Sequence, residues 1–152
     1  HPNSRRQRQM CIRDRHISNI LTVNRKVFDE KVLEAFGNIH DCCFIAKSCN
    51  YDTTKVRYYH DGDYYDPHID KTVQFLGFSY FYREPKRFKG GELIFPKYDY
   101  KFNCDNNSLI MMPGWVEHGV KEVKIENSDY FEGFGRYAIT SFFGNKEKKK
   151  TE

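Results

Sequence analysis

Two histidines and one aspartate are the residues of this 152-residue chain whose types and spacing could hold a metal ion. His68 and Asp70 lie two positions apart in a strand-like stretch, and His118 follows a Pro-Gly turn much later in the chain. Side chains at i and i+2 of a strand point to the same face, so His68 and Asp70 could face one ion together. Two imidazoles and one carboxylate on one side of an ion, with its other positions open, are typical of non-haem iron(II) sites that activate oxygen.

An arginine near the end of the chain could bind a carboxylate beside such an ion. Arg136 lies in GRYAITSFF (135–143), a segment that is otherwise mainly apolar and aromatic. Strand alternation places Arg136, Ala138 and Thr140 on one face. A guanidinium beside a hydroxyl suits two-point recognition of a small carboxylate, and this interpretation is favoured over a surface salt bridge because of the apolar setting.

The elements that must position these residues are one helix followed by short strands. Apolar residues near helical spacing predict an amphipathic helix over 24–37, which ends at a glycine and packs against the outside of a sheet. After residue 41, strand-like segments alternate with turn signals. They are CFIAKSC (43–49), TKVRYYH (54–60), YYDPHID (64–70), VQFLGFSYFY (73–82), GELIFPKYDY (91–100), NSLIMMP (107–113), HGVKEVKI (118–125) and GRYAITSFF (135–143).

This order of elements predicts the fold class. Strands that follow one helix, without helices between them, indicate a mainly β chain with a double-stranded β-helix, that is, a cupin-like jelly roll with one or more flanking N-terminal helices. We expect a single domain over 16–144, with its core at about 55–143. Residues 1–15 have no usable periodicity and are interpreted as a non-native or disordered leader, and 145–152 as a solvated charged tail.

Composition limits the classes of partner, metal site and cellular location that the sequence supports. The formal net charge of +4 comes largely from the two ends of the chain, so it does not by itself indicate nucleic-acid binding. The five cysteines include no pair with structural-zinc spacing. No apolar stretch reaches membrane-spanning length and no signal peptide is visible, which predicts a cytoplasmic protein. The oligomeric state stays open.

Across roughly residues 55–143 the sequence resembles the Fe(II)/2-oxoglutarate-dependent dioxygenases, especially the prolyl 4-hydroxylase-like group. The resemblance rests on four segments in a fixed order: YHDGDYYDPHID (59–70), GGELIFP (90–96), MMPGWVEHGVKEV (111–123) and GRYAITSFF (135–143). It implies that His68, Asp70 and His118 bind Fe(II). It also implies that Arg136 binds the distal carboxylate of 2-oxoglutarate.

The resemblance further implies which residues complete the cosubstrate site. Tyr59 matches a tyrosine that commonly lies near the cosubstrate, and Tyr80 or Tyr82 is a weaker candidate for the same pocket. Strand register leaves the choice between the last two open. Many relatives carry Arg-x-Ser, whereas Ala138 occupies the serine position here, so Thr140 becomes the nearest same-face hydroxyl.

The activity implied by the resemblance is hydroxylation of a C–H bond with 2-oxoglutarate and O2, releasing succinate and CO2, with ascorbate as a reductant. Related halogenases lack the carboxylate ligand, so Asp70 favours hydroxylation. Aromatic and basic residues in 64–67 and 82–89 are expected to rim the site, where they could seat a proline-containing peptide or protein. A small-molecule substrate stays open.

Two alternatives are weighed against this reading. Relatives that demethylate nucleic acids usually carry a second arginine six positions after the first, and this chain has Phe142 there, so a nucleic-acid partner is disfavoured. A non-enzymatic cupin-like module would bind a metal or ligand without turnover. Cupins usually show a denser His-x-His and Glu cluster, which this sequence lacks.

Overall fold

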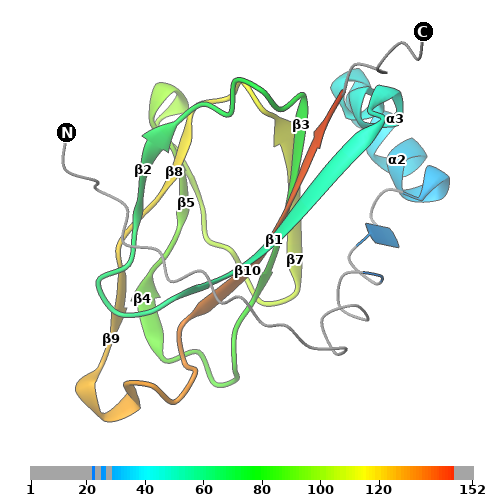
Figure 1. Ribbon diagram of the computed structural model, residues 1–152. Helices are drawn as coiled ribbons and strands as arrows, with labels where there is room; N and C mark the ends of the chain where they lie inside the picture. Colours follow the sequence, from blue (N-terminus) through cyan, green and yellow to red (C-terminus); the bar gives the residue numbers. More distant parts are fainter. Residues whose placement is uncertain (1–21, 23–24, 27–28, 146–152) are drawn as a thin grey trace, which may run out of the picture.

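Two antiparallel four-stranded sheets face each other in the computed structural model, which describes residues 22, 25–26 and 29–145 (Figure 1). The first sheet has the order β1 (Tyr51–Tyr59), β10 (Arg136–Gly144), β3 (Phe75–Phe81) and β7 (Ser108–Pro113). The second has the order β2 (Tyr65–His68), β8 (His118–Val120), β5 (Leu93–Phe95) and β6 (Tyr100–Phe102). A separate ribbon pairs β4 (Phe88–Gly90) with β9 (Val123–Ile125). The predicted mainly β jelly roll is therefore confirmed.

Strand alternation divides the apolar side chains of the first sheet between two cores. On β3, Leu76, Phe78 and Tyr80 point between the two sheets and join the larger core. Phe75, on the opposite face of the same strand, packs with Phe143 of β10 beneath the helices. Both faces of β3 are buried, which explains its nearly continuous apolar sequence.

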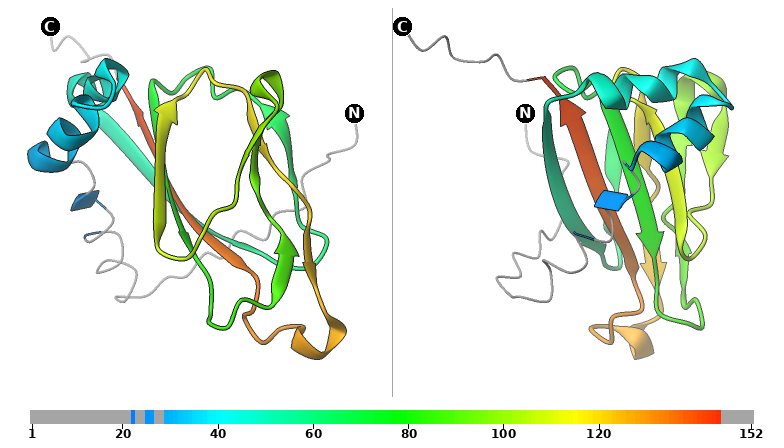
Figure 2. Two further views of the ribbon diagram at one scale, coloured as in Figure 1. Left: turned by 180° about the vertical axis from the view of Figure 1, so that it is seen from behind. Right: turned by 90° about the vertical axis from the view of Figure 1, so that its right-hand side faces the viewer.

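The helices cover the outer face of the first sheet, on the side away from the second sheet (Figures 1 and 2). They are α2 (Glu30–Gly37), the 3-10 turn η2 (Asp41–Phe44) and α3 (Ile45–Ser48). Leu33, Cys43 and Ala46 pack against Phe75 and Phe143. The prediction that the helix packs against the outside of a sheet is confirmed.

The strand predicted over 43–49 is wrong, because these residues form the end of η2 and all of α3. His40 begins the helical segment by accepting the Cys42 backbone N–H on its Nδ1 atom at 3.2 Å. Cys43 and Ala46, three positions apart, then share one helical face toward the sheet. The burial of this apolar run follows a helical period and not the period of two expected for a strand.

Three further boundaries differ from the sequence prediction. The segment 91–100 breaks at a proline that begins the 3-10 turn η3 (Pro96–Tyr98). The segment 118–125 divides into β8 and β9, because its two halves pair with different partners. β4 was not predicted. A last 3-10 turn, η4 (Asn127–Asp129), precedes β10.

Some sequence predictions lie outside the described residues. These are the leader at 1–15, positions 24 and 27–28 of the predicted helix, and the tail beyond residue 145. Within the part of the chain that the structure describes, no helix is both long enough and apolar enough to cross a membrane.

Candidate metal centre and cosubstrate cavity

The second sheet brings the two histidines together. β2 and β8 pair so that His68 lies directly opposite His118. β2 ends at His68, and Asp70 lies in the turn that follows, where its backbone N–H donates to the Gly114 carbonyl at 3.0 Å. The carboxylate is therefore placed by a turn held to the loop before β8, and not by alternation along one strand as the sequence suggested.

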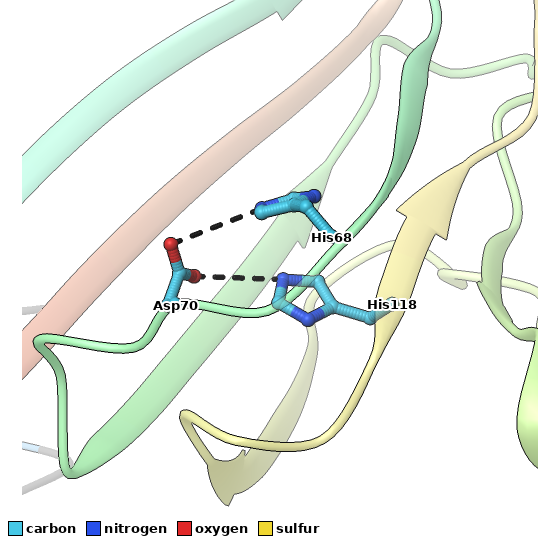
Figure 3. A group of neighbouring side chains, drawn as sticks. All are labelled: His68, Asp70 and His118. Carbon is cyan, nitrogen blue, oxygen red and sulfur yellow. Dashed lines mark ion pairs between the residues drawn. The ribbon is translucent and has the colours of Figure 1, made fainter.

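The three side chains converge on one point (Figure 3). Asp70 lies to one side of the two rings and faces both, with Oδ1 3.8 Å from His68 Nε2 and Oδ2 3.7 Å from His118 Nε2. One ligand atom from each residue lies within 4.8 Å of the others. Two imidazole nitrogens and a carboxylate are the donor set that suits a divalent iron with open coordination positions, so these residues fit the metal that the sequence predicts.

Backbone carbonyls orient both imidazoles. His68 Nδ1 lies 2.9 Å from the Asp66 carbonyl, and His118 Nδ1 lies 2.9 Å from the Val116 carbonyl. A carbonyl can only accept, so each Nδ1 carries a proton, and in the neutral ring each Nε2 then presents its lone pair toward Asp70. The supporting hydrogen bonds therefore select the tautomer that a metal ligand needs.

Burial also favours the neutral imidazole at His118. This side chain is only 3% exposed. Burial is the largest effect on the pKa of His118 and lowers it below its ordinary value. A neutral ring can donate its Nε2 lone pair to a cation without first losing a proton.

A cavity extends from these ligands into the space between the two sheets, and Arg136 lies at its buried end. Arg136 is 2% exposed, and its guanidinium carbon lies 4.7 Å from the ring centre of Tyr59 and 4.5 Å from that of Tyr80. Nη2 reaches Cys104 Sγ at 3.7 Å. The two rings and the thiol hold the cation in place.

Several buried polar atoms at this end of the cavity have no hydrogen-bond partner among the described residues. Among the described residues, Nε and Nη1 of Arg136 and the Tyr80 hydroxyl are buried without one. Buried donors without partners are costly, and a buried cation even more so. A carboxylate that entered from the metal side could accept from the guanidinium and from the phenol, so the cavity fits a small dicarboxylic acid with one end at the metal and the other at Arg136.

Of the two candidate tyrosines, Tyr80 lines the cavity and Tyr82 does not. β10 pairs Ala138 with Tyr80, which points Tyr80 into the cavity, and burial raises the pKa of its phenol well above the ordinary value. The phenol therefore stays protonated and can donate. Tyr82 does not line the cavity; its ring packs against Phe88 at a centroid distance of 5.7 Å. Tyr59 and Thr140 do line it.

With this geometry established, comparison with known proteins assigns the family. The sequence model described as the 2OG-Fe(II) oxygenase superfamily matches residues 54–144. The chain belongs to this superfamily. The assignment confirms the resemblance found in the sequence, and the matched residues contain the candidate metal ligands, the cavity and Arg136.

Solved structures show the same fold. A 2OG-Fe(II) oxygenase family oxidoreductase from Burkholderia pseudomallei is 14% identical, with a TM-score of 0.57 over 82% of this chain and 55% of its own. A Pseudomonas putida prolyl-4-hydroxylase is 16% identical, with a TM-score of 0.52 over 78% of this chain and 65% of its own. This chain thus spans less than two thirds of either protein. No curated protein sequence matches it.

The sequence analysis missed two basic residues that line the cavity. Lys55 and Arg57 on β1 alternate with Tyr59 and line the same cavity. Arg57 lies opposite Ala138 in the β1–β10 pairing, and its Nη1 donates to Thr140 Oγ1 at 3.3 Å. The signal that could have found them is their spacing at two and four positions before Tyr59 in a strand.

The segments 64–67 and 82–89 were expected to rim the site, and only the first contributes a residue to the lining of the cavity. Tyr65 lines the cavity, and its ring centre lies 4.3 Å from that of His68. None of residues 82–89 lines it. Instead, Arg83 donates to the Glu132 carbonyl and Arg87 pairs with Asp129, which packs this segment against the turn at η4.

Proposed function

We propose that this chain forms the catalytic core of an Fe(II)- and 2-oxoglutarate-dependent dioxygenase that hydroxylates a C–H bond. One observation carries the proposal. The unpaired donors of Arg136 and Tyr80 lie in the same cavity as a histidine, aspartate and histidine cluster. A metal site alone would not require a buried cation with free donors at the far end of its cavity.

His68, Asp70 and His118 would hold the iron, and the carboxylate would offset part of its charge. Bound iron would supply the redox chemistry that couples oxidative decarboxylation of 2-oxoglutarate with O2 to hydroxylation, releasing succinate and CO2. The protein places the reactants. The hydrogen bonds to the Asp66 and Val116 carbonyls fix both imidazoles before any ligand arrives.

Arg136 and Tyr80 would bind the distal carboxylate of the cosubstrate. A guanidinium nitrogen without a partner and a protonated phenol offer donors to one carboxylate. Tyr59 covers one face of the guanidinium and is itself buried, so it would exclude water from this ion pair. Thr140 already accepts from Arg57, so its hydroxyl proton stays available as a further donor.

A prolyl side chain of a peptide or protein is the substrate we favour. The Pseudomonas putida neighbour of the same fold is a prolyl-4-hydroxylase. Tyr65 and Phe142 line the cavity of this chain near its exposed end, where flat rings could pack against a pyrrolidine. Ascorbate would act as the reductant that maintains Fe(II). A small molecule that carries a similar aliphatic ring would use the same walls.

Succinate formation tests this proposal. Purified protein with Fe(II), 2-oxoglutarate, ascorbate and O2 should form succinate slowly even without the primary substrate. His68→Ala should abolish the signal while circular dichroism shows an intact fold, and His40→Gln, a change outside the cavity, should retain it. Equal succinate formation by His68→Ala would refute the assigned ligands. Binding of 2-oxoglutarate without any turnover, even with a peptide library present, would instead favour a cupin-like binding module.

A further inference from the structure

Lys55 and Arg57 give the open end of the cavity more positive charge than the proposed reactants need. Fe(II) and Arg136 together would be balanced by the two carboxylates of 2-oxoglutarate and by Asp70. Asp70 is the one acidic side chain among the described residues that line the cavity. Neither Lys55 nor Arg57 forms an ion pair with any residue that the structure describes. Two cations therefore remain without an anion.

Arg57 is directed toward the open end and away from Arg136. Its row across the sheet contains Ala138, whose small side chain leaves the guanidinium free to lean along the strand. It reaches Thr140, one row nearer the exposed end, and its guanidinium carbon lies 5.6 Å from the ring centre of Phe142, a further row along. The cation is thus held on the side where a substrate would enter.

A groove continues from this end of the cavity across the surface. It shares Lys55, Asp70 and Phe142 with the cavity and then runs between the first residues of β1 and the turn that contains Thr72. The cavity holds about 80 Å³ of free volume and the groove about 290 Å³. With the cosubstrate bound, little of a substrate beyond its reacting group would fit in the cavity, and the remainder would lie in the groove.

We propose that the substrate is an extended polypeptide segment that lies in this groove and sets an acidic side chain against Lys55 and Arg57. The inference rests on the proposed function and adds the class of substrate sequence. Arg57 can offer its remaining guanidinium N–H groups to a carboxylate while Nη1 stays on Thr140. Lys55 is exposed and can adjust to the position of the charge.

A polypeptide fits this groove better than a nucleic acid does. Proteins that bind nucleic-acid backbones neutralise several phosphates along a track. Lys55 is the one cation among the described residues that line the groove, and Arg57 stands beside it in the cavity. A single anchored carboxylate flanked by the rings of Tyr51 and Phe142 matches a peptide with one acidic residue near its target.

Peptide binding measured without turnover tests the proposal. Fluorescent short peptides with a central proline carry one Asp at successive positions, with matched series that carry Asn or Lys. Anisotropy is recorded with protein that holds Zn(II) and 2-oxoglutarate. At one or two positions, Asp should bind about ten-fold more tightly than Asn, because a charge-assisted pair is gained. Added salt should reduce this preference.

Variants identify the residues responsible. Arg57→Gln should abolish the preference for Asp, and Lys55→Glu should replace it by a preference for Lys at the same position. Lys101→Glu makes the same charge change on exposed β6, outside the cavity and the groove, and should keep the preference for Asp. Equal binding of Asp and Asn peptides, or a preference for Asp that survives in both Arg57→Gln and Lys55→Glu, would overturn the proposal. So would binding of single-stranded oligonucleotides without any peptide binding. Failure of the oxygenase assignment would appear separately, as absent succinate formation.

Discussion

Replacing Arg136 by Met should separate cosubstrate binding from folding stability. Methionine keeps a long, flexible side chain but removes the charge and every donor. The change removes the guanidinium nitrogens Nε and Nη1, which are buried without partners among the described residues. It also removes the two ring contacts to Tyr59 and Tyr80. We expect these losses to act in opposite directions on the protein without 2-oxoglutarate.

The magnitudes follow from these contacts. Each buried donor without a partner costs about 1–3 kcal/mol, and each desolvated cation–π contact stabilises by about 1–2 kcal/mol. The two effects nearly cancel, so the free energy of unfolding without 2-oxoglutarate should change by about 1 kcal/mol or less. Two charge-assisted hydrogen bonds to the distal carboxylate contribute about 3 kcal/mol together, so Kd should rise about 150-fold in Arg136→Met.

Urea unfolding with and without 2-oxoglutarate measures both quantities, with Zn(II) in place of iron. At a ligand concentration of one hundred times the wild-type Kd, wild type should gain about 2.7 kcal/mol and Arg136→Met about 0.3 kcal/mol. Arg87→Met removes an arginine that pairs with Asp129 outside the cavity, and it should retain the full gain. A loss of more than about 3 kcal/mol without ligand, together with an unchanged gain, would show that Arg136 is structural and refute the reasoning.

Two further predictions concern single side chains. Gly91 has φ of +73°, and a Cβ there would lie 3.0 Å from Arg136 Cδ, so Gly91→Ala should weaken 2-oxoglutarate binding as well as destabilise the fold by about 1–2 kcal/mol. Gly62→Ala is the matched control in a binding titration, because its φ is +75° and no described atom lies within 4 Å of the added Cβ. The Tyr130 phenol donates to Asp61 and lowers the pKa of that carboxyl. Because the folded pKa lies below the unfolded value of about 3.9, this stabilisation is present above that pH and is lost as the pH falls through the folded pKa. Tyr130→Phe should therefore lower the urea midpoint at pH 7 and match wild type in strong acid; an equal deficit at both pH values would contradict this.

The sequence predicted those parts of the site that depend on local pattern. Alternation along the last strand correctly put Arg136, Ala138 and Thr140 on one face, and all three line the cavity. It could not choose between Tyr80 and Tyr82, because the choice depends on where β3 ends and how it pairs with β10. Pairing between strands distant in sequence is a tertiary property, and periodicity within one strand does not contain it.

Two misreadings have the same physical origin. His68 and Asp70 do face one point, but a hydrogen bond from Asp70 to the Gly114 carbonyl brings the carboxylate there. Arg57 was missed by the sequence analysis, although it alternates with Tyr59 on β1. The pairing of β1 with β10, which sets Arg57 opposite the small Ala138 side chain, places this face of the strand toward the cavity. In both cases a contact between distant segments supplies what the local pattern does not contain.

The central claim is that one cavity holds iron and 2-oxoglutarate together, and anaerobic titration tests it without knowledge of the substrate. Fe(II) and 2-oxoglutarate are added to the protein without O2, and the visible metal-to-ligand charge-transfer absorption is recorded. We predict a band in wild type, no band in His68→Ala, and a band in Arg136→Met only at much higher 2-oxoglutarate concentrations. No band in wild type at saturating concentrations, or an equal band in His68→Ala, would contradict the account.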